Sequence, residues 1–331
     1  MKIGSRSVGH AARAGFAAAL FITIVSAGAT AMAQTYPARP VRLVVPFGVG
    51  GSVDTLARLV TQPISETWGQ QILVDVRPGA GSLIGTDIVA KSKPDGYTLM
   101  MANASSAMAV SVYKTVPYDL LRDFTAAGMI GYTPHLTVVH PSLPAGTLQE
   151  LIRLARSNPK EINYSSAGNG VGSHLAVELF KTMAKVDLAH VPYKGAGQAV
   201  TALVGGEVSL MIVNLVSAAA HVKTGKLRAL GLADAKRSPL LPNVPTMAEA
   251  GLPYEFTEWY GIIGPAGTPR EMIVKWNSEI NRVVGGREFQ ERLAGLGATP
   301  KTGTPEEFNG YLRAEVERYA KIVRVAGVKV D

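Results

Sequence analysis

From Val41 onward, short runs of β-branched residues alternate with stretches in which apolar residues recur every three to four positions. Runs of the first kind predict buried strands, and stretches of the second kind predict amphipathic helices. We expect strands at 41–47, 71–76, 97–102, 136–139, 162–164, 187–191, 208–213, 227–232 and 260–263. Strands that alternate with helices are typical of an α/β fold with largely parallel sheets.

Several helix boundaries can also be read from the sequence. A helix is expected to open at Ser52 or Asp54, and the last helix is expected to end at Gly327. A threonine followed three residues later by glutamate is the signature of a capping box. This spacing occurs at Thr147, Thr246, Thr268 and Thr304.

The first 33 residues differ from the rest of the chain. Basic residues precede the apolar run GFAAALFITIVSAGATA, and Ala-Met-Ala at 31–33 gives a small-x-small pattern before Gln34. The apolar run is shorter than the roughly 20 residues that a membrane span needs. Residues 1–33 therefore predict a secretory signal peptide that is cleaved near Ala33 and Gln34.

The composition narrows the possible functions. The chain has 331 residues, of which 47% are hydrophobic, so it can bury a large core. It has no cysteine, and its formal net charge is +8, which falls to +5 without the signal segment. Lys and Arg are dispersed and do not form a basic run, so we expect no nucleic-acid partner.

Three glycine- and hydroxyl-rich loops are the main candidates for ligand binding. The first loop is FGVGGSVD at 47–54, the second is ANASS at 102–106, and the third is SSAGNGVGSH at 165–174. Each follows a predicted strand and precedes a helical stretch, so each can present free backbone N–H groups to an anion. Any one of these loops could also be only a tight turn with a cap. Three together predict a binding site.

Other interpretations of these residues are weaker. Gly48-x-Gly50 and the later Asp75 fit a dinucleotide-binding turn, but Val53 occupies the place of the third glycine. The sequence has no Gly-x-Ser-x-Gly elbow, phosphate loop or zinc-binding helix motif, and we predict no metal and no cofactor. Four histidines lack metal-ligand spacing and are expected to be structural: His135, His140, His190 and His221.

Catalysis would need a nucleophile beside a base. Ser173 and His174 are adjacent, but at the start of a helix their side chains point in different directions. A secreted hydrolase or isomerase that uses these two residues and an acid is therefore the weaker alternative function. Lys194 is the best single charged candidate for contact with an anion, although a solvated loop lysine would look the same.

Several longer segments together resemble one protein family. They include PFGVGGSVDTLAR, VDVRPGAGSLIGTDIVAKSKPDGYTL, YSSAGNGVGSHLAVELFK, HVPYKGAGQAVTALVGGEV, GKLRALGLADAKRSPLLPNVPTMAEAGLP and PAGTPREMIVKWNSEI. The chain resembles the Bug family, the TctC-like periplasmic solute receptors of tripartite tricarboxylate transporters. The resemblance extends from YPARPVRLVVPF to the C-terminus.

The resemblance implies a two-lobed, Venus-flytrap fold of the type II periplasmic-binding-protein kind, with the ligand in a cleft between the lobes. We expect 34–131 to form the first part of lobe 1 and 132–235 to form lobe 2. The segment 236–331 would cross back to lobe 1 and end in the C-terminal helix. Such a monomeric receptor captures a small carboxylate without chemistry and delivers it to a membrane transporter. A periplasmic partner of a sensor protein would use the same pocket and is a second alternative.

By position, the resemblance also implies ligand-binding residues in all three loops and beyond them. They are Phe47, Gly50, Gly51, Ser52 and Asp54 in the first loop, Asn103 and Ser105 in the second, Ser166, Asn169, Gly172 and Ser173 in the third, and also Lys194 and Asn214. Asp54 could shape the turn without touching the ligand, because an aspartate would repel an anion.

The chain departs from the family pattern at two places. Gly48-Val49 replaces a common Pro-Pro, which we expect to loosen one wall of the pocket. Val213 stands where the family often has aspartate, which would make the cleft less hostile to negative charge and disfavour ligands with an amino group. The identity of the carboxylate stays open among aliphatic dicarboxylates, citrate-like, nicotinate-like and phthalate-like acids.

Overall fold

The computed structural model describes Met1 and residues 36–330. The predicted signal peptide at 1–33 lies almost entirely outside the described residues, and only Met1 of it is described. The described residues from Arg39 onward form one compact unit. Among the described residues, no helix combines the length and the apolar character that crossing a bilayer would require.

The strands of this unit form one hydrogen-bonded path in the order β2-β1-β3-β9-β4-β7-β5-β6, and β8 and β10 also pair with β4. Their bounds are β1 (Val41–Val45), β2 (Ile72–Val76), β3 (Thr98–Asn103), β4 (Phe124–Val139), β5 (Asn163–Ser166), β6 (Ala189–Pro192), β7 (Leu210–Asn214), β8 (Arg228–Leu232), β9 (Thr257–Pro265) and β10 (Thr299–Pro300). The outer strands are parallel, as predicted, but β4 and β9 pair antiparallel with their neighbours, so the sheet is mixed.

Helices follow most of the strands and cover the sheet. They are α2 (Ser52–Trp68), α3 (Leu83–Ala90), α4 (Ala104–Val112), α5 (Leu148–Ser157), α6 (Gly172–Ala184), α7 (Ala196–Val204), α8 (Leu215–Lys223), α9 (Arg270–Gly285), α10 (Arg287–Leu296) and α11 (Pro305–Ala326), with a 3₁₀ turn at Ala80–Ser82. The last helix ends at Gly327 in the left-handed conformation, which confirms that prediction.

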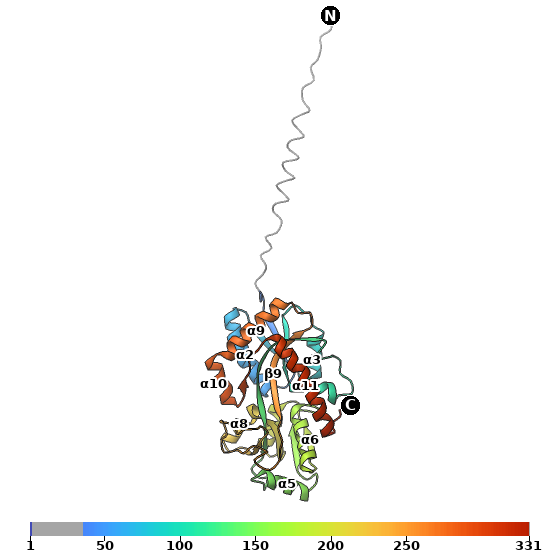
Figure 1. The fold of residues 1–331 in the computed structure, drawn as a ribbon, viewed down its shortest axis with the longest axis vertical. Helices are drawn as coiled ribbons and strands as arrows, with labels where there is room; N and C mark the ends of the chain where they lie inside the picture. Colours follow the sequence, from blue (N-terminus) through green and yellow to red (C-terminus); the bar gives the residue numbers. More distant parts are fainter. Residues whose placement is uncertain (2–35, 331) are drawn as a thin grey trace. The chain divides into compact units, whose positions relative to one another are not determined.

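Two halves of the unit are joined through β4. Its residues 124–134 pair with β9, whereas 135–139 pair with β7 and β8. In Figure 1, α2, α3 and α9 surround one half and α5, α6 and α8 surround the other, with β9 in the middle. The predicted lobe boundaries at 131 and 235 stay a prediction. We propose that the chain crosses at 134/135 and returns at 256/257, because Phe256 still hydrogen-bonds with Ala233.

The first two thirds of β4 were missed by the sequence analysis. This part contains Gly128, Gly131 and Pro134, which are poor strand formers, and its register with β9 shifts twice. A Cβ atom on Gly131 would lie 2.3 Å from the carbonyl oxygen of Thr299, so the glycine is needed for β10 to approach. Long-range packing, and not local preference, makes this segment a strand.

The four predicted capping boxes have different outcomes. Those at Thr147 and Thr304 are complete and start α5 and α11, which confirms them. Thr246 and Glu249 make both hydrogen bonds of the box, but they close a turn and not a helix. The prediction at Thr268 is wrong, because its hydroxyl donates to the carbonyl of Pro265 and α9 begins two residues later.

Removing the cap of α11 should measurably destabilise the protein. The Thr304 hydroxyl accepts the Glu307 N–H at 3.1 Å, and Thr304→Ala removes this acceptor. We expect the free energy of unfolding to fall by about 1 kcal/mol in denaturant titrations. Thr302→Ala, at an exposed position before the helix, serves as the control. Equal losses in the two variants would contradict a capping role.

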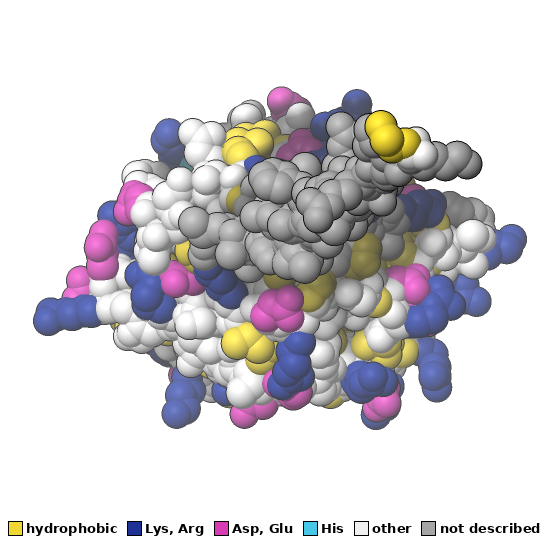
Figure 2. Space-filling view, turned by 90° about the horizontal axis from the view of Figure 1, so that it is seen from above, with side chains coloured by type: hydrophobic (Ala, Val, Ile, Leu, Met, Phe, Trp, Pro, Cys, Tyr) yellow, Lys and Arg dark blue, Asp and Glu magenta, His cyan; other side chains and the backbone are white. Residues whose placement is uncertain are grey.

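Charged side chains are spread over the surface. On the described part of the face in Figure 2, Lys and Arg side chains stand among Asp and Glu and do not gather into one patch. Several charged side chains form ion pairs within a helix, such as Arg287 with Glu291 and Arg292 with Glu288 in α10. This distribution agrees with the absence of a basic run in the sequence.

Candidate functional site

A narrow pocket lies where the beginnings of five helices meet. It encloses about 390 Å³ of space, including its opening to solvent. Its lining includes the first residues or N-caps of α2, α4, α6, α7 and α8, namely Ser52, Asn103, Gly172, Ala196 and Asn214. The first N–H groups of a helix lack partners within the helix, and the helix dipole is positive there. The pocket is therefore suited to an anion.

The first loop turns the chain from β1 into α2. Gly50 has a φ of +79°, and Gly51 caps the helix, so Ser52 is buried at the pocket wall. The Gly50 N–H donates to the Asp54 carboxylate at 3.1 Å, and Arg58 pairs with the same carboxylate at 2.8 Å. Asp54 thus shapes the turn and is not among the lining residues.

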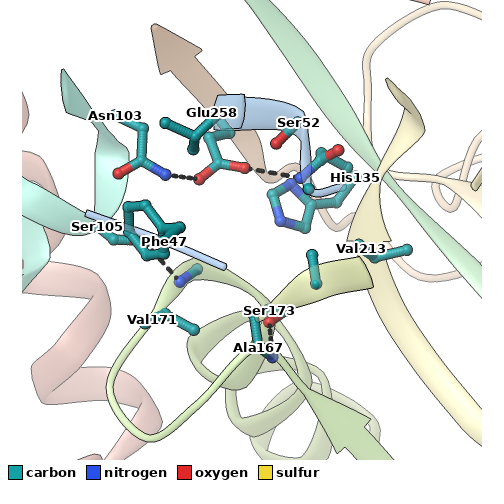
Figure 3. Close-up of a pocket in the computed structure, with 15 residues that line it drawn as sticks. Phe47, Ser52, Asn103, Ser105, His135, Ala167, Val171, Ser173, Val213 and Glu258 are labelled. Carbon is teal, nitrogen blue, oxygen red and sulfur yellow. Dashed lines mark hydrogen bonds between the residues drawn. The ribbon is translucent and has the colours of Figure 1, made fainter. Parts of the chain in front are cut away.

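The second loop is tied to the third. The Ser105 hydroxyl accepts the backbone N–H of Gly172 at 3.1 Å, which joins the start of α4 to the start of α6 (Figure 3). These two residues are 67 positions apart in the chain. The hydrogen bond holds two helix beginnings on one side of the pocket.

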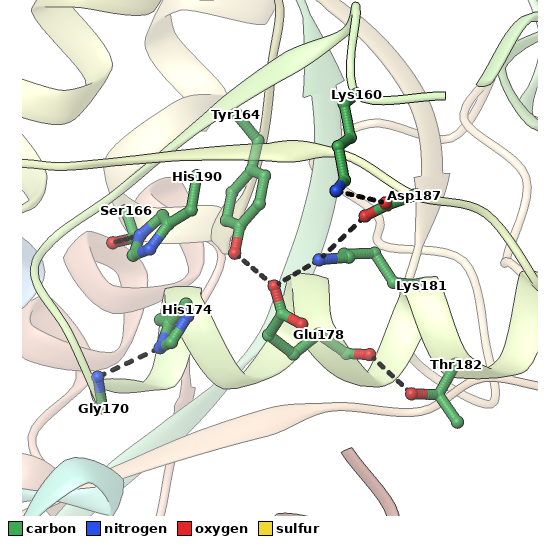
Figure 4. A network of polar contacts seen from close by, with 10 residues as sticks. All are labelled: Lys160, Tyr164, Ser166, Gly170, His174, Glu178, Lys181, Thr182, Asp187 and His190. Atoms are coloured by element: carbon green, nitrogen blue, oxygen red, sulfur yellow. Dashed lines mark hydrogen bonds and ion pairs between the residues drawn. The ribbon is translucent and has the colours of Figure 1, made fainter. Parts of the chain in front are cut away.

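Hydrogen bonds and stacked rings brace the third loop. The Ser173 hydroxyl accepts the Ala167 N–H at 2.9 Å, and Ser166 and His190 form a 2.6 Å hydrogen bond. The rings of His174 and His190 stack with centroids 4.2 Å apart. Figure 4 shows both beside a network in which Tyr164 donates to Glu178. Burial lowers the pKa of His190 to about 3, so this ring is neutral.

The structure brings together eight of the thirteen predicted site residues. They are Phe47, Gly51, Ser52, Asn103, Ser105, Gly172, Ser173 and Asn214. Asn169 and Lys194 line an adjoining, wider pocket that shares Phe47 and Ala167 with the first. The remaining three, Gly50, Asp54 and Ser166, line neither pocket. Their assignment as ligand contacts stays a prediction.

Glu258 is a pocket residue that the sequence analysis missed. It lies on β9, is 4% exposed, and accepts hydrogen bonds from the side-chain amides of Asn103 at 2.6 Å and Asn214 at 3.0 Å. The Tyr260 hydroxyl donates a third, at 3.1 Å. Burial raises the pKa of Glu258 to about 7, although the three hydrogen bonds oppose the shift. The pocket therefore contains a carboxyl group, although Val213 stands where the family often has an aspartate.

His135 also lines the pocket, although the sequence analysis assigned it a structural role. It is 1% exposed, and its Nδ1 has no hydrogen-bond partner among the described residues. Burial lowers its pKa to about 3, so the ring is neutral. His135 therefore lies at the pocket, and its assignment as a structural residue stays a prediction.

Sequence alone carried a weak signal for one of these two residues. Glu258 is the only acid in the run TEWYGIIGP, and a carboxylate within a buried strand is unusual. His135 follows Pro134 at the point where β4 changes partners, and nothing local marks it. In the described residues, no group of three His, Asp or Glu side chains is arranged to hold a metal.

Three glycines lie beside the pocket and form a glycine seam, which we define as Gly48, Gly195 and Gly197. Their chain neighbours Phe47 and Ala196 line the pocket. A Cβ atom on Gly48 would lie 2.8 Å from the carbonyl oxygen of Lys194, and one on Gly197 would lie 2.7 Å from that of Val49. The preceding strands, β1 and β6, stand near opposite ends of the sheet path. Gly48 therefore makes a tight contact between the two halves, and the expected loosening of this wall stays a prediction.

Known proteins are similar to this chain in sequence and in fold. Residues 56–328 match the model of the tripartite tricarboxylate transporter family receptor. Protein BugT of Bordetella pertussis is 38% identical over 314 residues, which cover 94% of this chain and 96% of BugT.

Two solved structures add ligands to the comparison. R. palustris Rpa4515 with adipate is 38% identical, with a TM-score of 0.86 over 89% of this chain and 99% of that one. MatC from Rhodopseudomonas palustris with bound malate is 33% identical, with a TM-score of 0.84. The match covers 87% of this chain and 100% of the MatC chain. The predicted two-lobed α/β fold of periplasmic binding proteins is confirmed by these similarities.

Proposed function

Because the chain belongs to the tripartite tricarboxylate transporter family of receptors, we propose that it captures a small carboxylate in the periplasm and delivers it to a membrane transporter. The observation that carries this proposal is the meeting of five helix beginnings at one pocket. Among the described residues, no Lys or Arg lines this pocket, so backbone N–H groups and small polar side chains would hold the anion.

The class of ligand follows from the relatives and from the shape of the site. Rpa4515 and MatC hold adipate and malate, which are both dicarboxylates. In this chain, the narrow pocket would take one carboxylate, and the rest of the ligand would extend past Phe47 into the adjoining pocket. Lys194 lines that second pocket and could meet a distal acid group. Di- and tricarboxylates and aromatic acids all fit this arrangement.

The same geometry supports binding without chemistry. The Ser173 hydroxyl and His174 Nδ1 each accept a different backbone N–H, from Ala167 and Gly170 respectively. Ser166 does bond to His190, but Ser166 is fully buried and this histidine is a very weak base. Neither serine is therefore an activated nucleophile.

Capture would proceed by closure of the two halves over the ligand. Closure shifts the population from an open form toward a closed form, and the closed form is the one that a transporter would recognise. The glycine seam is the contact that this closure would make. The predicted signal peptide would place the receptor, as a monomer, in the periplasm.

A thermal-shift screen tests the proposal. Protein from Gln34 onward, unfolded and refolded to strip any bound ligand, is screened against adipate, malate, citrate, nicotinate and phthalate. A ligand at one hundred times its dissociation constant stabilises the folded state by about 2.7 kcal/mol. We expect at least one of the five acids to raise the melting temperature and to be recovered unchanged. A flat response to all five would contradict the proposal.

A matched pair of variants locates the binding site. A Cβ atom on Gly172 would project into the pocket, 3.6 Å from Glu258 Oε1, so Gly172→Leu should fill the pocket and abolish the shift. Gly310 on α11 has no atom within 4 Å of its Cβ position, so Gly310→Leu should keep the shift. A shift that survives in Gly172→Leu would place the ligand elsewhere.

A further inference from the structure

Glu258 is a buried carboxyl group that no cation neutralises. The groups that favour its charged form are the amides of Asn103 and Asn214 and the hydroxyl of Tyr260, with no Lys or Arg among them. A buried charge without a counter-ion is costly, so such a group takes a proton or a cation when its surroundings become more negative.

We propose that Glu258 holds the ligand carboxylate through a shared proton, so that ligand binding above neutral pH takes up one proton from solvent. This inference rests on the proposed function. It assigns Glu258 as a ligand-contacting residue and makes the receptor bind its ligand together with a proton.

The geometry places the two acids side by side. The Cβ position of Gly172 is 3.6 Å from Glu258 Oε1 and 3.7 Å from His135 Nε2. A ligand carboxylate at the beginning of α6 would therefore lie against Glu258. Two carboxylates that share a narrow site cannot both ionise readily, so one of them retains a proton. The ligand acid contacts the helix beginnings, which favour its charge, so Glu258 is the group that takes the proton.

The site can accept a protonated Glu258. Oε1 is the Glu258 oxygen that faces the Gly172 Cβ position, so it would carry the proton and donate it to the ligand carboxylate. The Asn103 amide donates to Oε1, and the Asn214 amide and the Tyr260 hydroxyl donate to Oε2. These donors can stay in place, because the oxygens of a protonated carboxyl group still accept hydrogen bonds. Burial has already raised the pKa of Glu258 to about 7, so the proton is taken up at little cost near neutral pH.

His135, Tyr260 and Tyr319, which lie around Glu258, keep one charge state between pH 6 and 9. On β4, His135 is neutral because burial lowers its pKa to about 3. Tyr260 on β9 and Tyr319 on α11 are neutral because burial raises their pKa values. On α2, Asp54 is paired with Arg58. A pH dependence of binding in this range therefore reports on Glu258.

Isothermal titration calorimetry in buffers of different ionisation enthalpy tests the inference. The probe is whichever of adipate, malate, citrate, nicotinate and phthalate binds most tightly at pH 6. We expect uptake of about one proton per ligand at pH 8 and much less at pH 6. The affinity should fall by up to about tenfold per pH unit above pH 7, because free Glu258 is then ionised.

Two variants separate Glu258 from general effects of charge. Glu258→Gln mimics the protonated acid, so it should show no proton uptake and bind the same probe more tightly than the wild type at pH 8.5. Glu255→Gln removes an exposed carboxylate three residues away and should keep the wild-type proton uptake and pH dependence.

The outcomes distinguish this inference from the proposed function. Binding of the probe without proton uptake at pH 8 would overturn the inference and leave the proposed function intact. Release of a proton would also overturn it, because Glu258 would then lose a proton when the ligand binds instead of taking one up. Failure of all five acids to bind at pH 6 would overturn the proposed function and the inference with it.

Discussion

Replacing Gly197 by alanine should weaken carboxylate binding by about 5- to 150-fold without destabilising the free protein. The new Cβ atom would lie 2.7 Å from the carbonyl oxygen of Val49, a backbone atom that cannot move without shifting the first loop. Overpacking of this kind costs about 1–3 kcal/mol, which corresponds to that range of affinity. Under the proposed closure, the glycine seam would form when the two halves meet, so the cost would fall on the closed form alone.

In the absence of ligand, Gly197→Ala should not lower the stability of the protein. Gly197 is the second residue of α7, and alanine in a helix is about 0.5–1 kcal/mol more favourable than glycine. We therefore expect denaturant titrations without ligand to show equal or higher stability, while calorimetry with the best-binding acid shows weaker binding. Gly205→Ala, at the C-terminal end of the same helix, has its nearest contact at 3.4 Å and serves as the control. Wild-type affinity in Gly197→Ala would mean that the seam takes no part in closure.

The second large effect is a dependence of the free energy of unfolding on pH, caused by Glu258. The pKa of Glu258 is raised from its ordinary 4.5 to about 7 in the folded protein. Between these two values the folded protein binds a proton that the unfolded chain has lost. The free energy of unfolding should therefore fall as the pH rises from 4.5 to 7 and stay lower above 7. A shift of this size corresponds to about 3 kcal/mol.

Glu258→Gln should remove this dependence. Its free energy of unfolding, relative to the wild type, should increase by about 3 kcal/mol between pH 4.5 and pH 8, as measured by denaturant titration of ligand-free protein. Glu255→Gln should run parallel to the wild type over the same range, because Glu255 is exposed. A constant difference between Glu258→Gln and the wild type would show that Glu258 ionises as easily in the folded protein as in the unfolded chain.

Coupling to a proton would make ligand binding depend on pH, which the loops alone would not do. Helix beginnings attract any small anion, and their partial charges change little with pH. A carboxyl group among them adds a requirement for one proton per ligand. Capture would then be strongest at acidic to neutral pH, and a rise in pH would favour release.

Some of the site could be predicted from the chain alone. The three loops were recognisable because glycine, serine or asparagine recur between a strand and a helix in all three, and each loop lies where it was expected. The caps at Thr147 and Thr304 depend on residues three positions apart, so a local pattern is sufficient to identify them. The helix from Ser52 and its bracing by Asp54 are local in the same way.

Other features exist only in the folded molecule. Asn103 meets Glu258 across 155 positions of sequence, and Gly48 meets Gly195 across the two ends of the sheet path. The first two thirds of β4 form a strand because β9 pairs with them, against the preferences of their glycines and proline.

The sequence by itself therefore determined the kind of site, namely loops at helix beginnings that suit an anion. Only the tertiary structure decided that a buried acid stands among them and that glycines of both halves meet beside the pocket. The physical reason is that loop and cap chemistry acts within a few residues, whereas burial, the pKa of Glu258 and the seam depend on which distant segments pack together.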